Sequence, residues 1–142
     1  MGFTFPQSTP AWGFAYIPAA TVLINNAAEK SNATDAWAQM KTITLNETIY
    51  NASLFRFIFD LKSGGATDAK GRIKRNGVWI GTEQTVNGTT YGTKTEDIVA
   101  TTWVKGDVIE LWTLNTGGQL AYCRNFQLCG LWISNPFVNT LV

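Results

Sequence analysis

The chain has 142 residues, of which 45% are hydrophobic and 15% are charged, and its net charge is +1. This length suits one domain with a sizeable core, and a charged fraction below the usual ~25% is typical of a β-protein or of a surface covered by partners. The sequence has no block of basic residues, which disfavours nucleic acid as a ligand. No apolar run approaches the ~20 residues of a membrane span.

The N-terminal segment, residues 1–19, contains three of the four prolines together with Phe3, Phe5, Trp12 and Phe14. Prolines disfavour a helix, and the apolar content disfavours a free tail. Two interpretations stay open: an extended arm that lies on this domain or on a neighbouring subunit, or an ordinary first strand with its lead-in. The segment lacks the basic start and continuous apolar core of a signal peptide, so we expect synthesis and maturation in a cytoplasm.

Short strands are expected over residues 21–24, 37–45 and 54–62, with a polar loop over 25–35. The last of these strands, LFRFIFDLK, has the clearest pattern. Its three phenylalanines fall on one face, whereas Arg56, Asp60 and Lys62 fall on the other. Such alternation is typical of a half-buried antiparallel strand, so the phenylalanines are expected at the centre of the core.

Residues 69–83, AKGRIKRNGVWIGTE, predict a tight hairpin. Asn76-Gly77 lies between two strand-forming runs and is typical of a two-residue type I′ turn, in which both positions need a positive φ. A shift of one residue would exchange the two faces of the hairpin, so the pattern specifies its own register. The expected pairs are Arg75 with Val78, Lys74 with Trp79, Ile73 with Ile80, and Arg72 with Gly81.

The hairpin register also predicts a polar face with one aromatic residue. Lys74 lies opposite Trp79, which permits a cation–π contact, and Arg72 shares their face. Two interpretations stay open: a contact surface for a ligand or a subunit, or an exposed strand face on which Trp79 shields the lysine stem. The inward face of the hairpin is expected to carry Ile73, Val78 and Ile80.

Further strands are expected over residues 89–98, 108–114 and 119–128, with a last strand and tail over 131–142. Trp103 is expected to plug one end of the core. Trp112 shares the face of Glu110, and it belongs either to a second exposed aromatic site or beneath the N-terminal arm. With eight or nine short strands and no convincing helix, the pattern predicts an all-β antiparallel sandwich or jelly roll of about eight strands over residues 20–142, preceded by the arm.

Few residues in the sequence indicate catalysis, metal binding or disulfide formation. The absence of histidine excludes Ser-His-Asp and Cys-His systems and most zinc sites. If Cys123 and Cys129 share one strand they are about 20 Å apart, too far for a disulfide, so buried reduced thiols are expected, with a bond between subunits as the alternative. Turn formation explains the scattered carboxylates, such as Asp107, better than calcium binding does. We therefore expect no cofactor, no metal and no enzyme.

The order of LFRFIFDLKSGG, RIKRNGVWIGTE, WVKGDVIELW and YCRNFQL resembles the small jelly-roll domains of bacteriophage and related virion proteins, among them decoration proteins and fibre heads. Those domains share a general plan with tumour-necrosis-factor-like and complement-globular-head jelly rolls. The resemblance covers residues 37–130 and carries over no catalytic residue. It implies a structural or adhesive protein, often a trimer.

These observations favour a virion structural protein, foremost a capsid decoration protein, that assembles with copies of itself as a trimer and with a capsid or another virion protein. It would be made in the host cytoplasm and reside in the virion. The alternative is a carbohydrate-binding module or a receptor-binding fibre head, whose partners are glycans that stack on exposed tryptophans. The interface candidates are Phe3, Phe5, Trp12 and Phe14, and the surface contact candidates are Arg72, Lys74, Trp79 and Trp112.

Overall fold

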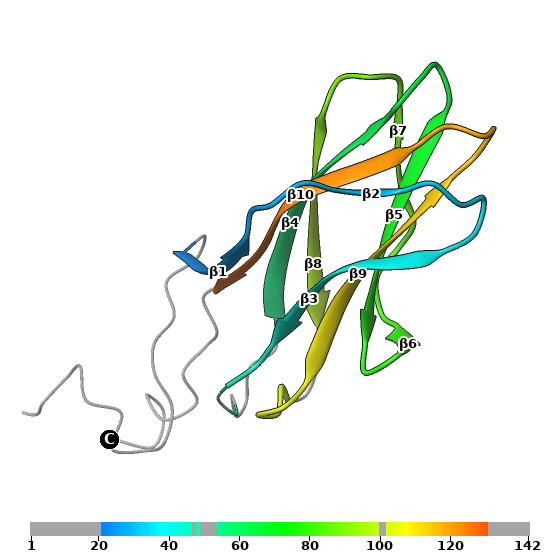
Figure 1. Cartoon of the computed structure of the whole chain (residues 1–142). Helices are drawn as coiled ribbons and strands as arrows, with labels where there is room; N and C mark the ends of the chain where they lie inside the picture. Colours follow the sequence, from blue (N-terminus) through cyan, green and yellow to red (C-terminus); the bar gives the residue numbers. More distant parts are fainter. Residues whose placement is uncertain (1–20, 47, 49–53, 100–101, 131–142) are drawn as a thin grey trace, which may run out of the picture.

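The computed structural model describes residues 21–46, 48, 54–99 and 102–130. In these ranges ten β-strands form two antiparallel sheets that pack face to face (Figure 1). No helix long and apolar enough to span a membrane occurs among these residues. The predicted class, an all-β antiparallel sandwich, is confirmed. The strands are β1 (Thr21–Asn26), β2 (Lys30–Asn32), β3 (Ala38–Thr44), β4 (Leu54–Ser63), β5 (Asp68–Arg75), β6 (Val78–Trp79), β7 (Gln84–Asn87), β8 (Gly92–Val99), β9 (Val108–Asn115) and β10 (Ala121–Gly130).

The two sheets are built on the same plan. One has the order β1-β10-β4-β8, and the other has the order β3-β9-β5-β6. In each, two short strands share one edge: β1 and β2 pair with β10, and β6 and β7 pair with β5. Strands β2 and β7 were not predicted, because three or four residues are too few to show a period-two pattern.

The core lies between the sheets and is centred on β4, as predicted. Phe55, Phe57 and Phe59 are fully buried on its inner face. Trp103 is also fully buried, with its ring centroid 4.9 Å from that of Phe55 and 6.0 Å from that of Phe57. The prediction that Trp103 plugs the core is therefore confirmed. The predicted last strand and tail, residues 131–142, and the arm, residues 1–19, lie outside the described residues.

Asp60 lies on the outer face of β4 but is buried, which corrects the expectation that it is exposed. Thr93 Oγ1 donates to its Oδ1 at 2.7 Å, and Asn125 Nδ2 and Arg124 Nε donate to its Oδ2 at 2.8 and 3.1 Å. Asn125 lies where the β10 register shifts, with a left-handed φ of 52°. Burial would raise the pKa of Asp60, but these hydrogen bonds outweigh it and hold the pKa below its ordinary value.

The hairpin between β5 and β6 has the predicted turn. Asn76 has a φ of 50° and Gly77 a φ of 80°, the left-handed conformation that a type I′ turn needs at both positions. The ladder pairs beside the turn are those predicted, Lys74 with Trp79 and Arg75 with Val78.

The ladder ends earlier than predicted, because the backbone N–H groups of Ile80 and Gly81 both donate to the carbonyl oxygen of Ile73, each at 3.1 Å. The expected Arg72–Gly81 pair is replaced by a side-chain contact, in which Arg72 Nε donates to Gly81 O at 2.7 Å. Ile80 packs on the core as predicted. The inward position of Val78 was predicted wrongly: it is 65% exposed, because it directly follows the turn on a two-residue edge strand that does not reach over the core.

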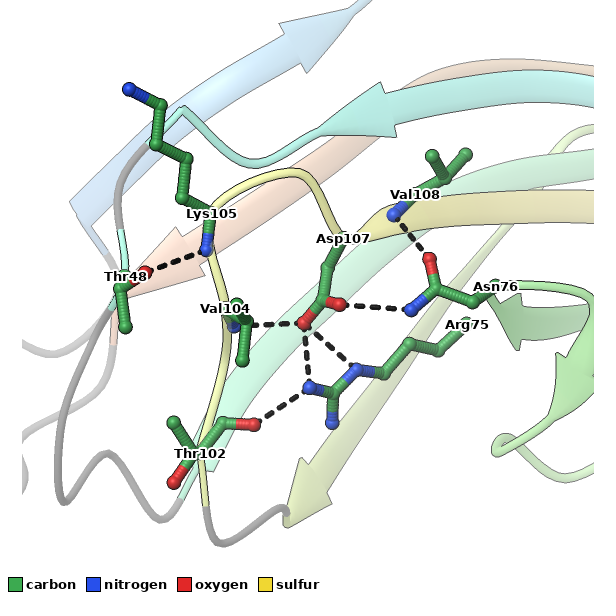
Figure 2. Close-up of polar contacts among 8 residues, drawn as sticks. All are labelled: Thr48, Arg75, Asn76, Thr102, Val104, Lys105, Asp107 and Val108. Carbon is green, nitrogen blue, oxygen red and sulfur yellow. Dashed lines mark hydrogen bonds and ion pairs between the residues drawn. The ribbon is translucent and has the colours of Figure 1, made fainter.

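A polar network around the buried carboxylate of Asp107 ties this hairpin to the turn before β9 (Figure 2). Asp107 is 7% exposed, and its Oδ2 accepts from Arg75 Nε and Nη2 at 2.9 and 2.6 Å and from Val104 N at 2.8 Å. Its Oδ1 accepts from Asn76 Nδ2, and Asn76 Oδ1 accepts from Val108 N, both at 2.8 Å. Burial would raise the pKa of Asp107, but these donors lower it overall. Asp107 thus holds two turns together.

Candidate functional site

The outer face of the β3-β9-β5-β6 sheet carries three of the six tryptophans. Lys74 on β5 has Trp79 and Glu110 as its two cross-strand partners. Two residues along β5, Arg72 is the partner of Trp112. Side chains two residues apart on a strand share a face, as do direct cross-strand partners. We call this group the tryptophan patch: Trp37, Arg72, Lys74, Trp79, Glu110 and Trp112.

The three indole rings of the patch are half-buried, and Trp37 and Trp112 both contact Trp79. The ring centroids of Trp37 and Trp79 are 5.2 Å apart at an interplanar angle of 63°, and those of Trp79 and Trp112 are 6.0 Å apart at 70°. Both pairs are edge-to-face, a favoured arrangement for aromatic rings. Trp79 is therefore the central ring.

Two cations lie against these rings. Lys74 Nζ is 3.6 Å from the ring centroid of Trp112 and 4.4 Å from that of Trp79. Arg72 Cζ is 4.8 Å from the ring centroid of Trp79, and its Nε is held by Gly81 O. The predicted Lys74–Trp79 contact is confirmed, and the same ammonium group also covers Trp112. Cation–π attraction therefore helps to fix both the rings and the charges.

Glu110 is the one carboxylate of the patch, and it is directed at an indole. Its Oε2 accepts a hydrogen bond from Trp112 Nε1 at 2.6 Å. Although Glu110 is a cross-strand partner of Lys74, the ion pairs within the described ranges involve neither Lys74 nor Arg72. On the same sheet Lys70 does pair with Glu83, at 2.7 Å. The patch therefore combines two cations with one carboxylate.

A second aromatic and charged cluster lies on the other sheet, and it differs in its charge balance. Lys62 Nζ is 4.4 Å and Arg124 Cζ is 3.9 Å from the ring centroid of Tyr91. Each of these cations has a carboxylate nearby: Glu29 is 3.9 Å from Lys62, and Asp60 is 3.1 Å from Arg124. The Tyr91 hydroxyl also donates to Glu29. This cluster is internally neutralised, which makes it a weaker candidate for a charged ligand.

The structure brings together the four surface residues that the sequence singled out. Trp112 does not form a separate aromatic site, because its ring packs against Trp79. Sequence reasoning missed Trp37, which lies just before β3 and was assigned only to a strand. The interface candidates of the arm, Phe3, Phe5, Trp12 and Phe14, lie outside the described residues.

The chemistry that the patch offers is binding. Its aromatic rings provide apolar surface and its ammonium and guanidinium groups provide donors, whereas the carboxylate of Glu110 is only 9% exposed and accepts from Trp112. Among the described residues no group of three or more His, Cys, Asp or Glu side chains could hold a metal ion. The fold and the patch together define a β-sandwich domain with an aromatic, charged surface on one sheet.

No family model matches the chain, and no curated protein matches it. Among solved structures, the insecticidal delta-endotoxin Cry8Ea1 from Bacillus thuringiensis is 14% identical over 70% of the chain with a TM-score of 0.49, and the chain spans 19% of the toxin. A carbohydrate-binding module, CBM36 in complex with calcium and xylotriose, is 18% identical over 74% of the chain and 97% of the module, with a TM-score of 0.46. The CBM22-1 xylan-binding domain of Paenibacillus barcinonensis Xyn10C is 14% identical over 79% of the chain and 96% of the domain, with a TM-score of 0.44.

These likenesses concern the β-sandwich fold alone, since each identity is below a fifth. The resemblance to virion proteins stays a prediction. The function must be argued from the tryptophan patch itself.

Proposed function

We propose that the chain is a carbohydrate-binding domain without catalytic activity, and that its ligand lies across the tryptophan patch. One observation carries the proposal: three indole rings in contact through Trp79 lie on the outer face of one sheet with two cations and a carboxylate among them. A sugar ring has an apolar C–H face that packs on an indole, and hydroxyl groups around its rim that hydrogen-bond to charged side chains. A binding surface of this kind needs apolar rings and a few placed polar groups.

The patch is also held in place before any ligand arrives. Trp79 is fixed by edge-to-face contacts with Trp37 and Trp112, and Trp112 is fixed by its hydrogen bond to Glu110. Rings that are already ordered lose little conformational freedom on binding, which favours affinity. This order supports a binding role more than a purely space-filling one, because the rings remain half-exposed on a sheet face.

The experiment is a glycan array screen, followed by calorimetric titration of the best soluble oligosaccharide with the chain and with Trp79→Ala. We expect selective glycan binding that weakens about tenfold or more in the variant, since loss of one stacked ring is worth roughly 1.4 kcal/mol. The matched control is Tyr122→Ala, which removes an aromatic residue from the opposite sheet and should leave affinity unchanged. The proposal fails if no glycan binds selectively, or if both variants bind as the unmodified chain does while near-ultraviolet circular dichroism shows each to be folded.

A second candidate, subunit assembly at a virion surface, is favoured by a different observation. Strand β1 is an edge strand of its sheet, and its Val22 and Leu23 are 49% and 42% exposed. Exposed apolar residues on a sheet edge favour pairing with another chain, and β1 begins two residues after the end of the predicted arm. Deleting residues 1–19 should then leave a folded domain that no longer forms a trimer or joins a capsid. Normal assembly of the truncated chain would contradict the role of the arm, and failure of the full chain to form a trimer or to join a capsid would contradict this candidate.

A further inference from the structure

We infer that the tryptophan patch is built for acidic saccharides, in which carboxylate or sulfate groups are carried on the sugar rings. The inference rests on the proposed function and narrows it from glycans in general to anionic ones. It comes from the charges among the rings rather than from the rings themselves.

The two cations of the patch have no ion-pair partner among the described residues, as is also true of Lys30, Lys94 and Lys105, but only these two lie side by side against the tryptophan rings. Lys70 on the same sheet pairs with Glu83 at 2.7 Å, and Arg124 on the other sheet pairs with Asp60 at 3.1 Å. Within the described residues, no carboxylate lies within 4.0 Å of the charged groups of Arg72 or Lys74. A neutral sugar does not supply the missing charge, whereas a uronate or sulfate group does.

The one carboxylate nearby is directed elsewhere. Glu110 faces Lys74 across the β5-β9 ladder, yet its Oε2 accepts from Trp112 Nε1 at 2.6 Å. Lys74 Nζ instead lies 3.6 Å from the ring centroid of Trp112. The indole thus keeps the acid at its edge and the ammonium group on its face. The patch retains a local surplus of positive charge, although the chain as a whole carries only +1.

The placement of the two cations strengthens this argument. Arg72 and Lys74 are two residues apart on β5, so their backbones are only about 7 Å apart and their side chains share a face. Like charges this close repel one another, and an anionic group bound beside them relieves the repulsion. Arg72 also retains donors for such a group: its Nε is used by Gly81 O, whereas its two terminal nitrogens can donate to a carboxylate.

The ring geometry explains why the anion would belong to a saccharide rather than to a simple ion. Trp79 carries both cations against its ring, with Arg72 Cζ at 4.8 Å and Lys74 Nζ at 4.4 Å from its centroid. A ligand larger than a simple ion that binds these charged groups can also contact the indole of Trp79. An acidic sugar presents both kinds of surface, an anionic group and a C–H face, within one ring.

The test is a calorimetric titration of the full chain with trigalacturonate and with the same trisaccharide after methyl esterification of its carboxylates, at low and at physiological salt. We expect the acid to bind about tenfold or more tightly than the ester, which corresponds to roughly one charge-assisted hydrogen bond. The preference should shrink as salt rises and should be lost in Arg72→Gln and in the double variant Arg72→Gln/Lys74→Gln. The matched control is Lys70→Gln, which removes a charge of the same sheet that Glu83 already neutralises.

A third ligand, a sulfated trisaccharide, distinguishes the source of the charge. Binding of both acids supports a site that responds to charge, and binding of the uronate alone supports one that responds to a planar carboxylate. Equal affinity for trigalacturonate and its ester would overturn the inference but leave the proposed function standing. If no saccharide of the array or of this series binds, the proposed function itself fails. If Trp79→Ala binds trigalacturonate as tightly as the unmodified chain does, the rings take no part and the inference is wrong.

Discussion

Arg75 and Asp107 form the most buried of the ion pairs among the described residues. Two nitrogens of the guanidinium donate to the same carboxylate oxygen, at 2.9 and 2.6 Å, between residues 32 positions apart in the sequence. The guanidinium also donates to Thr102 O at 2.7 Å (Figure 2). It lies 4.7 Å from the ring centroid of Trp103. One side chain therefore connects the hairpin, the turn before β9 and the tryptophan that closes the core.

We expect Asp107→Asn to destabilise the fold by about 3 kcal/mol, because an amide nitrogen or a neutral oxygen would face donors that now bind a buried carboxylate. The loss should appear as a lower urea midpoint with an unchanged slope. The control is Asp97→Asn, which alters the pair of Asp97 with Arg56 on an exposed part of β8 and β4 and should change the midpoint little. Equal effects of the two substitutions would show that burial does not matter at Asp107.

The stability of the domain should fall in acid. The native state holds the pKa of Asp60 and of Asp107 below the ordinary 3.8 of an aspartate, because hydrogen bonds from neighbouring donors outweigh the opposing effect of burial. The unfolded chain therefore binds protons more readily than the native chain in this range. The stabilisation is fully present above about pH 5 and is lost as the pH falls through 3.8 toward the lower native values.

Urea unfolding at a series of pH values between neutral and strongly acidic tests this dependence. The free energy of unfolding should decrease as the pH falls, and Asp107→Asn should show a smaller decrease than the unmodified chain because one of the aspartates with a lowered pKa is gone. If the free energy of unfolding of Asp107→Asn fell with pH as steeply as that of the unmodified chain, other carboxylates would be responsible for the pH dependence.

The sequence predicted the parts of the fold that depend on neighbouring residues. The alternation in β4 placed Phe55, Phe57 and Phe59 in the core, and Asn76-Gly77 set the first two pairs of the hairpin. It did not predict where the β10 register shifts, so the burial of Asp60 by Asn125 was missed. A shift of this kind depends on how two strands fit together rather than on the sequence of one.

The contacts of the candidate site divide in the same way: those between neighbours in the hairpin could be predicted from the sequence, and those across the sheet could not. Lys74 and Trp79 are paired by a local turn, so their contact could be derived from the sequence. Trp37 and Trp79 belong to opposite edges of the β3-β9-β5-β6 sheet, and their rings meet across the two strands between them. That contact depends on the strand order, which no local pattern in the chain specifies.

A further prediction concerns Gly71, which lies on the inner face of β5. A Cβ atom at this position would be 2.8 Å from Cε2 of the fully buried Phe59. Gly71→Ala should therefore destabilise the fold by about 1–3 kcal/mol, the usual cost of overpacking a core. Gly65→Ala is the control, because its Cβ would approach only the flexible side chain of Gln119, at 3.0–3.1 Å. A Gly71→Ala midpoint in urea as high as that of the control would mean that Phe59 can shift freely.

Lys41 is an unusual buried charge on β3, with 1% of its surface exposed. The β3 register shifts between Gln39 and Lys41, and Lys41 Nζ donates to Asn26 O at 2.9 Å, to Asn26 Oδ1 at 3.0 Å and to Ala28 O. Burial lowers the pKa of this lysine. Lys41→Met should cost roughly 1–3 kcal/mol in thermal or urea unfolding, because the oxygens of Asn26 and Ala28 lose a charged donor.

The control for Lys41→Met is Lys30→Met, which makes the same substitution at an exposed position on β2 and should leave stability nearly unchanged. An Lys41→Met variant as stable as the unmodified chain would show that packing of the methionine offsets the lost hydrogen bonds, as happens for some buried charges.

The thiols of Cys123 and Cys129 should be unreactive in the folded chain. Both residues are buried on β10 and free, and burial raises the pKa of Cys123 to about 11 and also raises that of Cys129. Because the thiolate is the reactive form, a colorimetric thiol reagent at neutral pH should label neither residue in the native chain and both in denaturant. Native mass under oxidising conditions should show no disulfide-linked dimer. Fast labelling of Cys129→Ser would contradict the burial of Cys123, and a cross-linked dimer would favour the alternative of bonding between subunits.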